Sequence, residues 1–371
     1  MTASEFASYR PPDEPRRRRR RRDGARPGSG RGRGPRRPGG ADGSREMPVV
    51  PDAEFTSYYG RPIVKPAPWG GDIAAYLFLG GLAAGSGLLA AGAQLTGRPA
   101  LRRVGRFAAI GSAGLGTVAL IRDLGRPERF ANMLRTIKVT SPMSVGSWLL
   151  AGFATSAGVA AAGEVDRMSA GRLPLGPLRP LLRQADGAAG IVAGALAPGL
   201  AAYTGVLLSA TATPTWNEAR DELPFLFAGS AALAAGGLAM IATPRAEAGP
   251  ARGLALAGVA ADLAASGVME RRVDPAIAET LRGGSAGEML RASQALAVTG
   301  GIGTLLAGRS RTAAVCSGAA LLAASVLTRF GIFEAGMASA RDPRYTVEPQ
   351  KRRLERRRAA GITDDSITTA E

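Results

Sequence analysis

The residues best suited to chemistry are polar and aromatic side chains placed where long apolar runs begin or end. Carboxylates there could exchange protons, hydroxyls could donate hydrogen bonds to carbonyl oxygens, and Trp and Tyr rings could wall a flat apolar slot. Such a set suits an amphipathic ring ligand, for example the head group of a quinone. Trp and Tyr at these positions are also common anchors at a membrane surface, so residue types alone leave both interpretations open.

Two groups of residues are candidates for this chemistry. The candidates for proton exchange are Asp72, Asp123 and Asp262. The candidates for holding the ring ligand, or for supporting the residues that do, are Trp69, Tyr76, Arg126, Ser144, Trp148, Tyr203, Thr213 and Trp216. All three tryptophans of the sequence belong to the second group.

Asp262 differs from the other candidates because it lies inside an apolar run. An ionisable residue at such a depth is costly, so it is a functional candidate by default. It could lie on a proton path, pair with an arginine such as Arg329, or lie near the end of its helix. The sequence leaves these three possibilities open.

The segment from Leu124 to Trp148 is dense in charged, aromatic, proline and hydroxyl residues, although it only has to connect two apolar runs. A segment that only connects two helices does not need this composition, so we expect a partner molecule to dock there. The arginines Arg122, Arg126, Arg129 and Arg135 could neutralise phosphates, but the preferred interpretation is that they meet acidic residues of a protein partner.

The composition excludes several kinds of redox centre. The sequence has no histidine and one cysteine, Cys316. Haem b needs paired histidine ligands, and iron–sulfur clusters and structural zinc need several cysteines or histidines. The chain is therefore expected to hold no haem, no iron–sulfur cluster and no metal of its own.

The apolar residues predict an all-α integral membrane protein. Runs of about 17–25 apolar residues fit the hydrocarbon core, where a spanning segment must be a helix, and small residues allow close helix packing. We expect eight spans within a membrane domain of residues 67–335. Their approximate limits are 73–95, 107–121, 145–163, 187–213, 223–243, 254–269, 292–308 and 312–333, with Arg106 placed to snorkel at the start of the second.

Both ends of the chain are basic. Residues 1–66 contain 16 Lys and Arg against 8 Asp and Glu, and this Arg-rich tail is too poor in apolar residues to fold. Residues 336–371 form a second basic tail. We expect both tails on the cytoplasmic side of the cell membrane, near anionic lipid, and no nucleic-acid partner, because aromatic residues do not alternate with the arginines.

Five segments resemble the polysulfide reductase membrane-subunit family, also called NrfD-like. They are Trp69–Gly81 (WGGDIAAYLFLGG), Asp123–Phe130 (DLGRPERF), Ser141–Trp148 (SPMSVGSW), Tyr203–Ser209 (YTGVLLS) and Pro214–Asn217 (PTWN). The resemblance covers about residues 67–345. It implies an anchor without haem and a quinone or menaquinone site on the face that docks an iron–sulfur subunit. That subunit would link to a molybdopterin catalytic subunit of the formate dehydrogenase or polysulfide/thiosulfate reductase type.

Two functional classes remain open on the sequence. The resemblance favours the quinone-reactive subunit of an oxidoreductase, with Asp72 and Tyr76 where the family places site residues. Family members often have a histidine or another polar residue in this region. This chain has no histidine, so here proton exchange would use a carboxylate or water. The alternative is a membrane transporter or lipid-binding protein without a redox role, whose gene neighbours would lack iron–sulfur and molybdopterin-binding chains.

Overall fold

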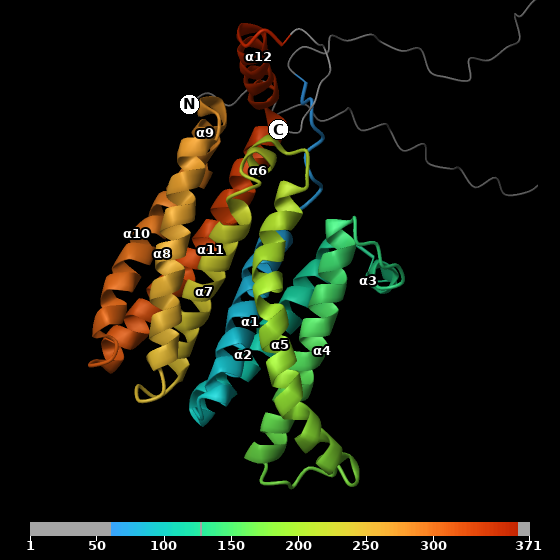
Figure 1. The fold of residues 1–371 in the computed structure, drawn as a ribbon, viewed down its shortest axis with the longest axis vertical. Coiled ribbons are helices and arrows are strands. Elements are labelled where there is room, and N and C mark those ends of the chain that lie inside the picture. The colour runs from blue at the N-terminus through green and yellow to red at the C-terminus, as the bar shows by residue number, and fades with distance from the viewer. Residues whose placement is uncertain (1–60, 127, 363–371) are drawn as a thin grey trace, which may run out of the picture. The chain divides into compact units, whose positions relative to one another are not determined.

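The computed structural model describes residues 61–126 and 128–362, in which every regular element is a helix. Residues from Pro62 onward form one compact unit, and only Arg61 is described of the other, Met1–Arg61. Eight long helices alternate in direction (Figure 1): α1 (Gly71–Leu95), α2 (Pro99–Asp123), α4 (Pro142–Met168), α5 (Leu178–Ser209), α7 (Leu223–Ala242), α8 (Gly249–Arg272), α10 (Gly284–Leu306) and α11 (Arg311–Arg341). Three short helices lie in the connections between them: α3 (Glu128–Met133), α6 (Pro214–Glu218) and α9 (Pro275–Arg282). A fourth, α12 (Arg344–Ala359), follows α11.

The long helices confirm the predicted class, an all-α bundle in a membrane. Seven of the described helices, all the long ones except α10, are long and apolar enough to cross a bilayer. α10 carries Glu288, Arg291 and Gln294 in its first half. The start of α1 and the end of α11 lie at the same end of the bundle, as an even number of passes requires (Figure 1). The span at residues 292–308 remains a prediction.

Helices extend beyond the apolar runs because a helix does not have to end where the hydrocarbon ends. α2 begins at Pro99, well before Phe107, and α5 begins at Leu178, before the apolar run at Gly187. Proline occupies one of the first two positions of α2, α4, α6, α7, α8 and α9, where its missing N–H costs nothing.

α1 is the central helix, in contact with α2, α5, α7 and α11. Small residues allow these helices to approach closely. A Cβ added to Gly85 would lie 2.6 Å from the Ala235 Cβ and 2.7 Å from the Ala231 carbonyl oxygen, so this glycine sets the close packing of α1 on α7.

A buried ion network joins α2, α4 and α5 at the end of the bundle opposite the start of α1. Arg106 Nη1 donates to Asp186 Oδ2 at 3.0 Å, Arg167 Nη2 lies 2.6 Å from the same oxygen, and Arg102 Nε lies 2.5 Å from Glu164 Oε1. The expectation that Arg106 snorkels at a helix end is wrong. α2 begins at Pro99, about two turns before Arg106, and the Arg106 side chain is only 3% exposed. Charges buried this deeply are stable only when they are paired, as they are here.

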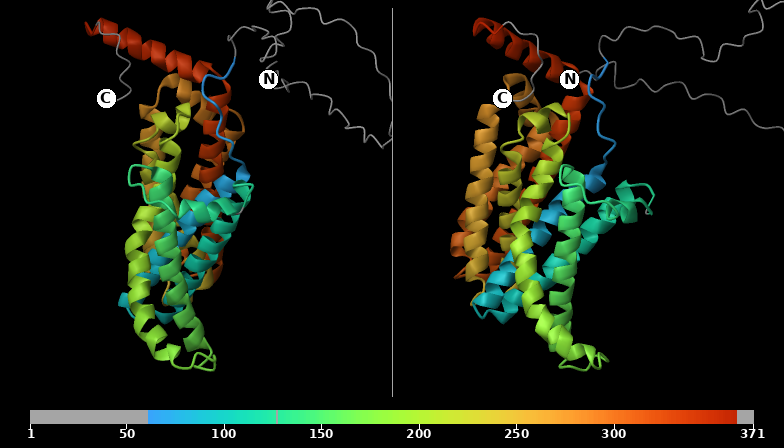
Figure 2. Two further views of the ribbon diagram at one scale, coloured as in Figure 1. Left: turned by 90° about the vertical axis from the view of Figure 1, so that its right-hand side faces the viewer. Right: turned by 45° about the vertical axis from the view of Figure 1, so that its right-hand side comes forward.

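α12 crosses the end of the bundle where α1 begins (Figure 2). Arg352 binds Asp274, whose Oδ1 also caps α9 by accepting from the Ala276 N–H, and Arg353 Nη2 donates to Glu218 Oε2 at 2.7 Å. The predicted basic tail 336–371 therefore contains an ordered helix tied to α6 and α9. Residues 1–60 of the predicted Arg-rich tail and residues 363–371 lie outside the described part of the chain.

Candidate functional site

A cavity of about 300 Å³ lies at the end of the bundle where α1 begins. Residues from α1 to α5 enclose it, and the segment around α3 contributes one wall. The lining is predominantly apolar, with a few hydroxyls and one carboxylate. The lining residues are Trp69, Ile73, Tyr76, Thr117, Leu120, Asp123, Leu124, Phe130, Met133, Leu134, Met143, Ser147, Leu150, Ala151, Ala154, Thr155, Tyr203 and Leu207.

The carboxylate of this lining, Asp123, is half-buried at the end of α2. Its Oδ1 accepts a hydrogen bond from the Gly70 N–H at 3.3 Å. This contact joins the end of α2 to the segment that carries Trp69, so a carboxylate and an indole ring border the same cavity.

Two tyrosines supply buried hydroxyls. Tyr76 of α1 is 4% exposed and Tyr203 of α5 is 7% exposed, and both line the cavity. Tyr203 lies against Gly146 of α4, where an added Cβ would overlap the phenol ring. Gly116 of α2 faces the Tyr76 ring: a Cβ added to this glycine would lie 3.6 Å from Tyr76 Cδ2. Glycines on α2 and α4 therefore provide the space in which the two tyrosines lie.

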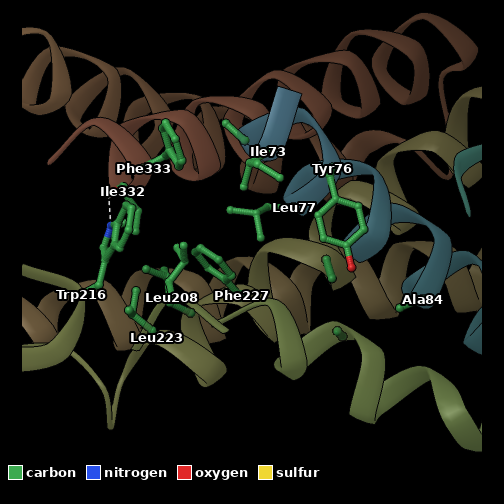
Figure 3. Packing of buried hydrophobic residues seen from close by; sticks show 14 of the residues in the cluster. Ile73, Tyr76, Leu77, Ala84, Leu208, Trp216, Leu223, Phe227, Ile332 and Phe333 are labelled. Atoms are coloured by element: carbon green, nitrogen blue, oxygen red, sulfur yellow. Dashed lines mark hydrogen bonds between the residues drawn. The ribbon is translucent and has the colours of Figure 1, made fainter. Parts of the chain in front are cut away.

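An aromatic stack supports the cavity from behind. Trp69 lines the cavity and stacks on Trp216 with ring centroids 5.9 Å apart and planes 25° apart. Trp216 is fully buried, and its Nε1–H donates to the Ile332 carbonyl at 2.8 Å (Figure 3). The Phe333 ring also packs against Trp216, with the ring centroids 5.7 Å apart. Trp216 thus fixes the position of Trp69 without itself lining the cavity.

The sequence comparison identifies the family of this membrane domain. A family model described as polysulphide reductase, NrfD, matches residues 63–257, more than half of the chain. The chain belongs to the NrfD family. Members of this family are membrane subunits of molybdoenzyme-type reductase complexes and generally pair with iron–sulfur and molybdopterin subunits. The matched region of the NrfD chain contains every residue that lines the cavity. No curated protein matches the chain in sequence.

In this NrfD domain, four of the predicted site residues come together in one lining: Trp69, Tyr76, Asp123 and Tyr203. Two others, Ser144 and Trp148, shape the segment beside it. Ser144 Oγ donates to the Thr136 carbonyl and accepts from the Lys138 N–H, both at 3.0 Å, and Trp148 Nε1–H donates to the Thr136 carbonyl at 3.3 Å. They anchor the segment whose neighbouring residues Phe130 and Leu134 contact the cavity.

The remaining predicted residues lie outside the lining. Asp72 is exposed, and its Oδ2 lies 4.0 Å from Arg122 Nε. Thr213 is buried just before α6, where its N–H donates to Thr211 Oγ1 at 3.4 Å. Asp262 lies elsewhere in the bundle, buried in α8. The arginines Arg122, Arg126, Arg129 and Arg135 are all exposed around α3, a position open to a partner.

Some polar lining residues of the NrfD cavity carry no recognisable signal in the sequence. Thr117 and Thr155 are single threonines within apolar helices, where a hydroxyl usually bonds to its own helix. Thr117 does so, since its Oγ1 donates to the Ala113 carbonyl at 2.8 Å. Ser147 stood within the segment SPMSVGSW, but its spacing could not show that it, rather than Ser144, lines the cavity.

Proposed function

We propose that this chain is the membrane anchor and quinone-reactive subunit of a molybdopterin iron–sulfur oxidoreductase. It would pass electrons between a partner iron–sulfur subunit and the quinone pool, in a complex of the formate dehydrogenase or polysulfide/thiosulfate reductase type. The observation that carries the proposal is the apolar cavity in which one carboxylate and two tyrosines converge inside the family-matched domain.

The lining fits the two ends of a quinone. Aromatic and aliphatic side chains such as Trp69, Phe130 and Leu150 suit a flat ring and the start of an isoprenoid chain. The Tyr76 and Tyr203 hydroxyls are the groups that would donate hydrogen bonds to carbonyl oxygens. A cavity of about 300 Å³ is at the lower end of the range for small-molecule sites, so it would hold the head group and leave a long chain to the lipid.

Asp123 has the position required for proton exchange. Reduction of a quinone to a quinol takes up two electrons and two protons. The chain has no histidine, so a carboxylate is its available acid and base near the cavity. In that direction the electrons would come from the partner subunit and the protons would reach the ring oxygens through Asp123 and water; oxidation of a quinol would use the same groups in reverse.

The exposed arginines around α3 suit the docking of that partner. Arg126, Arg129 and Arg135 lie beside the segment that walls the cavity. An acidic surface on the iron–sulfur subunit would bring its cluster close to the ligand. The same end of the bundle carries the basic helix α12, which adds positive charge for a partner or for anionic lipid.

The proposal is tested by isolating the complex through the full-length chain and identifying its partners. Iron–sulfur and molybdopterin-binding subunits should co-purify, and the complex should reduce or oxidise a short-chain menaquinone analogue. Isolation without either partner, together with no quinone-linked turnover, would overturn the proposal and favour a transporter or lipid-binding protein.

Asp123→Asn is expected to slow quinone-linked turnover by roughly tenfold, because an amide cannot exchange the proton although water near the cavity can partly replace it. Turnover of the soluble subunits with an artificial dye should stay unchanged. Asp72→Asn provides the comparison, since Asp72 lies outside the lining and is expected to have the smaller effect. Equal loss of dye-linked and quinone-linked turnover would instead indicate failed assembly.

A further inference from the structure

A second polar group lies deep in the bundle, apart from the cavity. Arg329 of α11 is fully buried. Its Nη1 donates to Thr204 Oγ1 at 2.9 Å, its Nη2 donates to the Phe227 carbonyl at 2.6 Å, and its guanidinium lies 3.8 Å from the centroid of the Phe227 ring. The charge of Arg329 also acts on Asp262 of α8, which is 1% exposed.

Asp262 differs from the other carboxylates buried in the bundle. Glu164 Oε1 lies 2.5 Å from Arg102 Nε, and Asp186 Oδ2 lies 2.6 Å from Arg167 Nη2. Such ion pairs are expected of buried carboxylates that remain ionised. Asp262 Oδ1 is buried and has no hydrogen-bond partner among the described residues, and the same holds for Arg329 Nε. One oxygen of the Asp262 carboxyl is therefore available to carry a proton.

Few other charges act on Asp262. α7 packs against α8 and contains no ionisable residue, and α10 has Glu288 and Arg291 near its start. α1 has Asp72 and Tyr76 near its start. On α8 itself, Glu270 is two turns further on and lies 3.6 Å from Arg282. Burial is thus the main influence on Asp262, and Arg329 is the charged group that acts on it.

Arg329 connects the surroundings of Asp262 to the helices that form the cavity. Thr204, its hydrogen-bond partner, follows Tyr203 directly in α5. Gly81, one turn after Tyr76 in α1, lies against the guanidinium, since an added Cβ would be 2.8 Å from Nη2. The two helices that present the cavity tyrosines, α1 and α5, are therefore the same helices that contact Arg329.

Two pairs of hydroxyls lie between α11, the helix that carries Arg329, and its neighbours α7 and α10. Ser230 of α7 and Ser325 of α11 are 2.8 Å apart, and Ser293 of α10 and Thr328 of α11 are 2.6 Å apart. All four are buried. Hydroxyls both donate and accept, so they are the groups that can relay a proton among these helices.

We propose that Asp262 is a proton-loading site, which takes up a proton and releases it again as the quinone in the cavity turns over. The proposal rests on the quinone function proposed above. The step is a simple protonation: a proton from water adds to the free carboxylate oxygen and later leaves it, and no electron is transferred. This proton is additional to the two that the quinone itself takes up.

The first test detects the proton itself, with no need for turnover. The full-length chain in lipid nanodiscs is titrated while its infrared spectrum is recorded. A carboxylic-acid carbonyl band that changes with pH should disappear in Asp262→Asn and persist in Glu270→Gln, the matched carboxylate of the same helix. If Asp262→Asn does not fold, Asp262→Glu should shift the band. Spectra that are identical in wild type and in the Asp262 variants would show a permanently ionised structural residue and overturn the proposal.

The second test uses the intact complex in sealed vesicles with a menaquinone analogue. Protons moved per two electrons are counted with a pH-sensitive dye. Asp262→Asn should lose the additional protons while quinone-linked turnover continues, and Asp262→Glu should restore them. An unchanged ratio in Asp262→Asn would overturn this proposal alone. A wild-type complex without quinone-linked turnover would overturn the quinone function instead.

Discussion

Replacing Trp216 with alanine is expected to lower the stability of the membrane domain by about 3–5 kcal/mol, the usual cost of removing a fully buried aromatic ring. Trp216 belongs to α6 and is completely buried where this helix packs against α11. Its ring lies against Gly336, where an added Cβ would overlap it, so neighbouring side chains cannot easily fill the space that it leaves. Thermal unfolding of the detergent-solubilised chain measures the loss.

Two substitutions separate the contributions to this effect. Trp216→Phe keeps most of the ring contacts but removes the Nε1–H that binds the Ile332 carbonyl, and should cost about 1–3 kcal/mol. Trp148→Ala is the matched control, because Trp148 is 41% exposed and its indole binds only the neighbouring loop. Equal destabilisation by Trp148→Ala and Trp216→Ala would contradict the structural role assigned to Trp216.

Loss of Trp216 should also weaken ligand binding. Trp69 stacks on Trp216 and forms part of the cavity wall, so it loses its support in Trp216→Ala. Binding of a menaquinone analogue below the unfolding temperature is expected to fall with it. Such a result would show that Trp216, although it does not line the cavity, affects the affinity of the cavity for its ligand.

The sequence predicts the fold class well because a segment in bilayer hydrocarbon must satisfy its own backbone hydrogen bonds. An uncharged run such as the one beginning at Ile73 must be a helix. Apolarity reports only the part of a helix that contacts hydrocarbon or core, however. It could not show that α2 begins at Pro99 or that α12 folds beyond the bundle, since charged helices gain their stability from partners such as Asp274. The burial of Arg106 depends on Asp186, distant in sequence, which no local pattern reveals.

The candidate site was predictable to the level of segments. Asp72 and Tyr76 are four residues apart in α1, but Tyr76 lines the cavity and Asp72 does not. Helix rotation decides between them, because Ile73 and Tyr76 lie on the face of α1 that lines the cavity, whereas Asp72 lies off that face in the exposed first turn. Ser144 and Ser147 differ for a related reason: Ser144 is drawn into the loop by Thr136 and Lys138. Such choices depend on helix rotation and loop path, which neighbouring helices determine.

Gly146→Ala is expected to reduce quinone-linked turnover by about a hundredfold, the scale associated with misplacing a positioned group by about 1 Å. An alanine Cβ would overlap the Tyr203 ring, so the tyrosine has to leave its present place beside the cavity. The change adds one methyl group and no charge, and it should leave dye-linked turnover of the soluble subunits unchanged. Steady-state assays with both electron acceptors measure the two activities.

Gly152→Ala is the matched control on the same helix. Its added Cβ would lie 3.5 Å from Leu196 Cδ1, an ordinary contact, and Gly152 does not line the cavity. Quinone-linked turnover should therefore remain near the wild-type value. If Gly146→Ala also keeps full turnover, Tyr203 does not have to occupy its present position, and the hydrogen bond assigned to its hydroxyl would be wrong. If Gly146→Ala alone loses turnover while the complex stays assembled, the space that glycine leaves for Tyr203 is a requirement of the quinone reaction.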